Sequence, residues 1–451
     1  MDKKPNILFL FGDQLNKYSL GCMGNSDVFT PILDELAKEG VLFTNAYSNS
    51  PLCTPYRINL FTGLYTRQTR TFANGSRIPR WSVSLADVFN EAGYETSYVG
   101  KWHIGGWGNT PVPRRLRGGF KHFIGYQCYN NYKKNVKFFD EQNRVKKYEG
   151  HRTDVTTDIA IERLQEIKDN PFLMFVSYQA PHYPVQPSPE FESIYKNIEV
   201  KKRPNVKSVG PFTRLWHRPS TPWPVQLSKD FRKYGKNLDE YIRLYYAMVS
   251  QLDYNIGRIL DELERLGIAD NTIIVFTSDH GDLQGSHGLK NKRKPFEESA
   301  GVPLIIKVPR GANGIKSDGI VSTVDFFPTF LDLAGLIEME DLPGKNFAPI
   351  LQGERMMLEG PVFSEMIKWT MVRYSKYKLV MRRRGKYRRV VRLYNLEEDP
   401  FELNNLARKK QYAPIRKELK KMIIDWKKQT RKQVLGTVLK SIGHKIVNIL
   451  H

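Results

Sequence analysis

Short apolar runs alternate with amphipathic segments along most of this chain. The runs predict buried strands at residues 6–11, 41–46, 94–99, 172–178, 272–277 and 303–307. The amphipathic segments predict helices at residues 31–38, 84–92, 154–167, 238–266 and 324–333. Strands that alternate with helices form βαβ units. The pattern therefore predicts an α/β fold, with a large, mainly parallel sheet flanked by helices.

The pattern changes after about Gly360. Closely spaced apolar segments at 362–365, 370–374, 378–382 and 388–394 predict an antiparallel meander, and a helix is expected from about Pro414. We therefore divide the chain into an α/β domain (1–359), a smaller C-terminal subdomain of antiparallel sheet plus helix (360–430) and a basic amphipathic tail (431–451). Such a tail can touch a membrane surface, although packing on the domain or fraying is the simpler interpretation.

The chain is strongly basic, with 70 Lys and Arg against 47 Asp and Glu, for a formal net charge of +23. This charge suits nucleic acid, an acidic glycan or another anionic substrate, or it is simply a solvated basic face. No nucleic-acid-binding motif is visible, so a nucleic-acid partner is not expected. The 451 residues hold no apolar run near the ~20 residues of a membrane helix. No signal peptide is evident, which indicates a cytoplasmic protein, or a periplasmic or secreted one if a leader was trimmed.

Four of the predicted strands are followed by polar residues with catalytic or ligand potential. They are Asp13 with Gln14, Lys101 with His103, His182, and Asp279 with His280. Ligands of open α/β sheets bind outside the carboxyl ends of the strands. Polar residues after one strand are usually a coincidence, but polar residues after four strands of one sheet predict a common site.

The acidic endings are candidates for a metal site. Asp13, Asp279 and the side-chain oxygen of Gln14 suit Ca²⁺ or Mg²⁺, which prefer oxygen ligands. His280 is a less typical calcium ligand and leaves Mn²⁺ or Zn²⁺ open. In the alternative interpretation, the two aspartates only cap the turns that follow them.

Cys53 begins the segment Cys-Thr-Pro-Tyr-Arg, which predicts a helix N-terminus that ends at Gly63. Unpaired N–H groups at that end suit an anion, and Arg57 adds a cation. Lys101 and one of the cations between 290 and 294 can neutralise further oxygens of a sulfuryl or phosphoryl group. His103 and His182 titrate in the range needed for proton transfer. Alternatively, Cys53 is a small buried residue and the histidines are surface residues.

Several of these segments together resemble the type I sulfatases of the alkaline phosphatase superfamily. The shared features are Cys-x-Pro-x-Arg at 53–57, Gly-Lys-Trp-His at 100–103, Ala-Pro-His at 180–182, Thr-Ser-Asp-His-Gly-Asp at 277–282, Gly-Ser-His-Gly-Leu at 285–289 and Leu-Tyr-Asn-Leu-Glu-Glu-Asp-Pro at 393–400. Lys292 falls where the family carries its substrate lysine. The resemblance implies a sulfuric ester hydrolase that acts on an anionic small molecule or glycan.

The resemblance also implies a cofactor and a role for each residue. Cys53 is expected to be oxidised to formylglycine (3-oxoalanine) by a maturation enzyme. Ca²⁺, with Mg²⁺ or Mn²⁺ as alternatives, is expected to bind Asp13, Gln14, Cys53, Asp279 and His280. Arg57, Lys101 and Lys292 are expected to bind the sulfate oxygens. His182, with or without Lys292, protonates the leaving alcohol, and His103 takes a proton from the second hydroxyl of the hydrated aldehyde.

Two departures leave other functions open. Many sulfatases carry aspartate in place of Gln14 and asparagine in place of His280, and the combination found here also occurs in formylglycine hydrolases of phosphonate monoesters and phosphodiesters. Lys101 together with His103 favours sulfate. A non-catalytic polyanion-binding relict is a further alternative. The charge and the aromatic segment 212–223 suit a sulfated saccharide, with Trp216 and Trp223 as sugar platforms or as core or lid residues.

Overall fold

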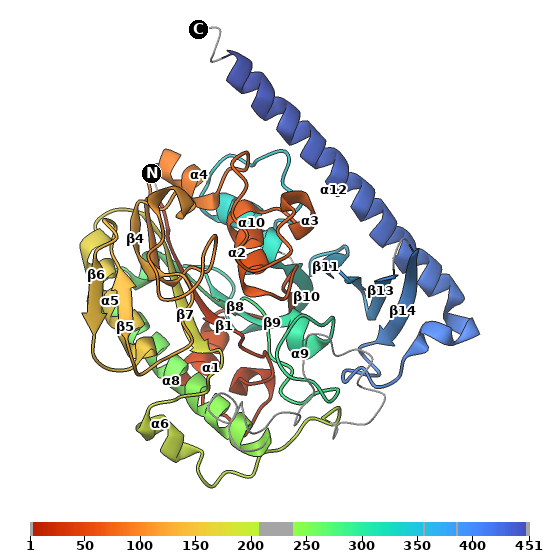
Figure 1. Ribbon diagram of the computed structural model, residues 1–451, viewed down its shortest axis with the longest axis horizontal. Coiled ribbons are helices and arrows are strands. Elements are labelled where there is room, and N and C mark those ends of the chain that lie inside the picture. The colour runs from red at the N-terminus through yellow and green to blue at the C-terminus, as the bar shows by residue number, and fades with distance from the viewer. Residues whose placement is uncertain (1–2, 207–237, 355–356, 385–386, 448–451) are drawn as a thin grey trace.

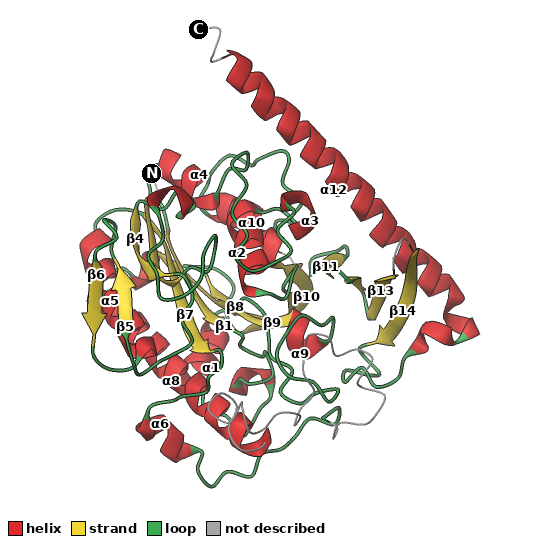
Figure 2. Cartoon of the chain, viewed as in Figure 1, coloured by secondary structure: helices red, strands yellow, loops and turns green. Residues whose placement is uncertain are grey.

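The computed structural model describes residues 3–206, 238–354, 357–384 and 387–447, so Trp216 and Trp223 lie outside the described residues. A ten-stranded sheet with the order β10-β2-β9-β8-β1-β7-β3-β4-β5-β6 forms its centre (Figures 1 and 2). The strands are β1 (Asn6–Asp13), β2 (Val41–Tyr47), β3 (Glu95–Lys101), β4 (His122–Tyr126), β5 (Val136–Phe139), β6 (Val145–Tyr148), β7 (Phe172–Pro181), β8 (Thr272–Ser278), β9 (Gly301–Lys307) and β10 (Ile315–Ser322).

The middle of the sheet is parallel. Strands β8, β1, β7, β3 and β4 follow one another in that order, and Ile7 of β1 faces Leu173 of β7 on one side and Ile273 of β8 on the other. β9 runs antiparallel to both of its neighbours, and β5 and β6 add an antiparallel hairpin at one edge. The predicted α/β fold with a mainly parallel sheet is therefore confirmed.

Helices cover both faces of this sheet, so β1 is apolar on both sides. Leu8 and Leu10 belong to the core under α1 (Pro31–Glu39), α5 (Arg152–Ile167) and α8 (Leu238–Arg265). Phe9 belongs to the core on the opposite face, where its ring meets Phe175 and the edge of Phe326. That face is covered by α2 (Cys53–Thr62), α4 (Leu85–Glu91) and α10 (Phe326–Leu333). Burial of both faces is typical of parallel sheets and produces continuous apolar runs.

The C-terminal part forms the predicted antiparallel meander, a four-stranded sheet in the order β11-β12-β13-β14. Its strands are β11 (Val362–Met366), β12 (Trp369–Tyr374), β13 (Tyr377–Arg384) and β14 (Tyr387–Asn395), and helix α12 (Ala413–Val447) follows. Trp426 of α12 stacks on Phe363 of β11, with ring centroids 4.6 Å apart. Beyond this contact α12 extends away from the body of the molecule (Figure 1). No helix in the described part of the chain is both long and apolar enough to span a bilayer.

A buried network of charges joins this second sheet to the first. Glu297, at the start of the short helix α9 (Glu297–Ala300), pairs with Lys17 at 2.8 Å and with Lys378 of β13 at 2.9 Å. Lys378 also lies 2.6 Å from Glu402, whose other oxygen accepts the backbone N–H of Glu297. Burial opposes ionisation of Glu297, but the two ammonium groups outweigh it and lower its pKa. The network therefore ties the C-terminal sheet to the segment that begins at α9.

Candidate active site

The four strands with polar endings are neighbours in the sheet. β8, β1, β7 and β3 are adjacent and parallel, so their carboxyl ends meet at one edge. In register, Gly12 lies beside Ser278, and Asp13 lies beside Pro181. The structure therefore brings Asp13, Gln14, Lys101, His103, His182, Asp279 and His280 into one region.

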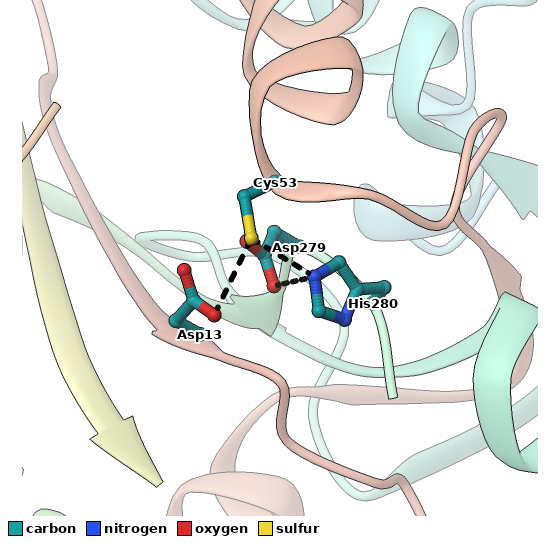
Figure 3. A group of neighbouring side chains, drawn as sticks. All are labelled: Asp13, Cys53, Asp279 and His280. Carbon is teal, nitrogen blue, oxygen red and sulfur yellow. Dashed lines mark hydrogen bonds and ion pairs between the residues drawn. The ribbon is translucent and has the colours of Figure 1, made fainter. Parts of the chain in front are cut away.

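Cys53 is the first residue of α2 and points into this region (Figure 3). Its Sγ lies 3.6 Å from Oδ1 of Asp13, 3.3 Å from Nε2 of His280 and 3.5 Å from Nζ of Lys292. The side chain is fully buried. Burial, aided by the charge of Asp13, raises the pKa of the thiol to about 12. An unmodified thiol there stays protonated at neutral pH and is a poor nucleophile.

Asp13, Cys53, Asp279 and His280 form a candidate metal group, with one potential ligand atom from each within 4.8 Å of all the others. Nδ1 of His280 lies 3.1 Å from the carbonyl of Gly281, to which it can donate. That contact leaves Nε2 of His280 with its lone pair toward Cys53 and Asp279. Such a backbone contact is typical of metal-binding histidines.

Asp279 shows that the group fits a cation. Its buried Oδ2 accepts no hydrogen bond within the described part of the chain, and the nearest cation, Nη2 of Arg57, lies 3.7 Å away. Burial and the negative charge of Asp13 raise the pKa of Asp279 to about 7. A divalent cation would stabilise both carboxylates in their ionised form, so the donor set fits the metal that the sequence predicts.

Gln14 lies beside this group and is held by Lys292 and by groups that the sequence did not single out. Its side-chain oxygen accepts a 2.6 Å hydrogen bond from Lys292, and its amide nitrogen donates to Asp282 at 2.5 Å and to Asn291 at 3.2 Å. Tyr241 of α8 also donates to Asp282, at 2.6 Å. The structure thus fixes Gln14 next to Lys292, and its role as a metal ligand stays a prediction.

Arg57 and Lys101 flank the group as buried cations. Arg57 donates to Ser177 at 2.7 Å and Tyr98 at 2.9 Å, and its other amino group reaches Asp13 at 3.3 Å. Nζ of Lys101 lies 2.6 Å from Asp13. Burial alone would raise the pKa of Asp13, but Lys101 together with His182, Lys292 and His280 outweighs burial and holds that pKa well below its usual range. With Lys292, the site holds three cations against two aspartates, a balance that suits a bound anion.

The two histidines are buried and neutral at pH 7. Burial, followed by the charge of Lys101, holds the pKa of His103 well below its usual range. Neither ring nitrogen of His103 has a hydrogen-bond partner among the described residues. Burial and Lys292 lower the pKa of His182 in the same way. Nδ1 of His182 contacts the carbonyl of Tyr183 at 2.6 Å, and its Nε2 faces Asp13 at 3.9 Å. Both rings therefore have a nitrogen available for a proton.

Two family models match the chain. The sulfatase model matches residues 5–336, and the model described as N-sulphoglucosamine sulphohydrolase, C-terminal, matches residues 285–429. The chain belongs to the sulfatase family, within the alkaline phosphatase-like superfamily. It is a sulfatase, an enzyme that hydrolyses sulfate esters. Family membership implies a metal ion and a formylglycine formed at Cys53.

Individual relatives cover nearly the whole chain. An ulvan-active sulfatase of Formosa agariphila is 30% identical over 92% of this chain and 80% of its own length. A choline-sulfatase of Rhizobium meliloti is 31% identical over 90% of this chain and 82% of its own. The structure of BT4656 in complex with its substrate D-glucosamine-2-N,6-O-disulfate superposes with a TM-score of 0.82, at 27% identity, over 95% of this chain and 99% of that one.

Proposed function

We propose that this sulfatase releases inorganic sulfate from a sulfated saccharide. The buried group of Asp13, Cys53, Asp279 and His280, flanked by Arg57, Lys101 and Lys292, is the observation that supports hydrolysis of a sulfate ester at this position. The relatives named for ulvan and for a glucosamine disulfate support a saccharide, as does the net charge of +23. The choline-sulfatase makes a small acyclic ester the alternative to test.

Each residue of the site has a proposed task. Formylglycine at position 53 would supply a hydrated aldehyde as the nucleophile toward sulfur. Asp13, Gln14, Cys53, Asp279 and His280 would hold a cation, which we take to be Ca²⁺ and which would favour ionisation of that nucleophile. Arg57, Lys101 and Lys292 bind the sulfate oxygens. These cations oppose the negative charge that spreads over the oxygens in the transition state.

The two histidines move protons. Nε2 of His182 gives a proton to the leaving alcohol. Burial and Lys292 lower the pKa of this ring, but the negative charge of a bound sulfate ester would raise it. His103 is placed to accept the proton of the second hydroxyl that the hydrated aldehyde would carry, and loss of that proton would allow sulfate to leave. Its two unpartnered nitrogens make it suitable as a base.

The test is release of sulfate by protein that carries formylglycine. The chain is co-expressed with a maturation enzyme, and the mass of the peptide containing residue 53 establishes the conversion. Sulfated mono- and oligosaccharides, choline sulfate, 4-nitrophenyl sulfate and phenyl phosphonate esters are then assayed in parallel. We expect the highest kcat/KM for a saccharide sulfate. Higher kcat/KM for phosphonate esters would support a hydrolase of phosphonate monoesters or phosphodiesters. No turnover of any ester by converted protein would support a non-catalytic polyanion-binding protein.

Removal of the metal is expected to lower kcat by about 10²-fold or more, because the cation offsets charge at the nucleophile and at the two aspartates. Protein is dialysed against EDTA and assayed for sulfate release, and EDTA saturated with Ca²⁺ serves as the control. Recovery with Ca²⁺ but not Mg²⁺ would identify calcium. The thermal midpoint should also fall in EDTA, since the two carboxylates lose their partner. Unchanged activity and midpoint would contradict a bound metal.

A further inference from the structure

Trp107 is an exposed aromatic side chain next to the catalytic region. It lies on the loop after β3, and 58% of its surface is exposed. The edge of one ring meets the face of the other between Trp107 and His103, with centroids 5.0 Å apart at an angle of 74°. Two other exposed aromatic residues of the described chain, Phe29 and Tyr254, contact Tyr195 and Phe191 instead. Trp107 is thus an exposed apolar surface in contact with His103 of the site.

The indole is held in position relative to α2. Gly75 has a φ of +83°, and a Cβ at this position would lie 2.7 Å from Nε1 of Trp107. Gly75 therefore allows a close approach that a larger residue would prevent. Its N–H donates to Thr54, which follows Cys53, at 3.3 Å. Thr110 donates to the carbonyl of Trp107 at 2.7 Å. An aromatic group fixed in this way loses little entropy when a ligand binds.

Polar side chains pack around the backbone of this loop. A Cβ on Gly106 would lie 2.7 Å from the amide of Gln127, so the side chain of Gln127 packs against the backbone that precedes Trp107. Oε1 of Gln127 is buried and has no hydrogen-bond partner among the described residues, and the same holds for Oδ1 of Asn109. An exposed apolar plate on a packed loop matches the apolar C–H face of a saccharide ring.

We propose that Trp107 is the platform on which the sugar ring carrying the sulfate stacks, and that it selects cyclic over acyclic sulfate esters. This inference rests on the proposed function, because it places the sulfate at Cys53 and the sugar ring of the ester against Trp107, while His182 protonates the leaving oxygen. It assigns Trp107 to substrate selection and not to proton transfer. The platform role that Trp216 and Trp223 suggested in the sequence concerns residues outside the described chain.

The test compares Trp107→Ala and Trp107→Phe on one cyclic and one acyclic ester, D-glucosamine 6-sulfate and propyl sulfate. Loss of an aromatic stacking contact should raise KM for the sugar about tenfold in Trp107→Ala. kcat should stay within about threefold, and Trp107→Phe should restore most of the affinity. kcat/KM for propyl sulfate should not change. Phe29→Ala, which removes an exposed aromatic group elsewhere, should alter neither substrate.

An equal loss on both esters, or no change on either, would overturn the proposal. A binding measurement separates this outcome from failure of the proposed function. If the proposed function is wrong, converted wild-type protein hydrolyses neither ester. In that case D-glucosamine 6-sulfate is titrated into Cys53→Ala protein, with and without Trp107→Ala, and the two dissociation constants show whether Trp107 binds the sugar. Weaker binding in the double variant supports the platform, and equal binding refutes it.

Discussion

Replacement of Cys53 by alanine is expected to abolish sulfate release, with a fall in kcat of about 10⁴-fold or more. The side chain at this position is surrounded by Asp13, His280 and Lys292 at 3.3 to 3.6 Å, and Cys53 is the one cysteine among the described residues that belongs to the proposed cation group. Alanine keeps Cβ as a methyl group but lacks the thiol from which the aldehyde is formed, so neither the attack on sulfur nor the release of sulfate can take place. The assay is sulfate release from the best substrate of the panel.

Cys22→Ala provides the matched control for this variant. Cys22 is partly buried in a short 3₁₀ helix before α1 and has no contact with the site. Its replacement should leave kcat/KM unchanged, and both variants should keep thermal midpoints close to that of the wild type. Activity like that of the wild type in Cys53→Ala would contradict the assignment of the nucleophile.

Lys378→Met is expected to lower the free energy of unfolding by about 3 to 5 kcal/mol, because it removes the shared cation of a buried network. Lys378 is fully buried and lies 2.9 Å from Glu297 and 2.6 Å from Glu402. Lys17 remains to pair with Glu297, whereas Glu402 keeps, among the described residues, the N–H of Glu297. Urea unfolding followed by tryptophan fluorescence measures the change. A loss below about 1 kcal/mol would contradict the coupling of the two sheets through this residue.

The decrease in the free energy of unfolding caused by Lys378→Met should also depend on pH. The direction of this pH dependence follows from the pKa of Glu402. Burial raises the pKa of Glu402 to about 7, above the ~4.3 of an unfolded glutamate. Such a group stabilises the fold most below pH ~4.3, where both states are protonated, and this contribution is lost as the pH rises through 7. Without Lys378 the ionised form is harder to bury, so Lys378→Met should be more harmful at about pH 8 than at about pH 5. Lys378→Met with Glu402→Gln should recover part of the stability and remove this pH dependence.

The sequence predicted the central strands because their burial on both faces leaves a continuous apolar run. β1 illustrates this, since Leu8 and Phe9 belong to cores on opposite sides of the sheet. It did not predict β6, whose side chains are largely exposed, or β10, which is polar over its first half. It also did not reveal that β9 runs antiparallel, because the apolar pattern of a strand is the same in either direction.

The candidate residues of the site could be selected from sequence because each follows a strand end or begins a helix. Their partners could not. Asp282 and Tyr241, which hold Gln14, come from a loop and a helix that only the fold places together. Trp107 gave no signal, since one tryptophan in a polar loop is not periodic. Its significance comes from the packing of Gly75 against it, a contact between distant segments.

The complete burial of Cys53 has a consequence for biogenesis. The sulfur lies beneath the first turn of α2, enclosed by two strand ends and Lys292. An enzyme therefore cannot bind the segment around Cys53 once the sheet has assembled. Oxidation of the side chain must therefore precede completion of folding, while the nascent polypeptide is still extended. Purified, unconverted protein should accordingly resist activation by the maturation enzyme unless it is first denatured and allowed to refold in its presence.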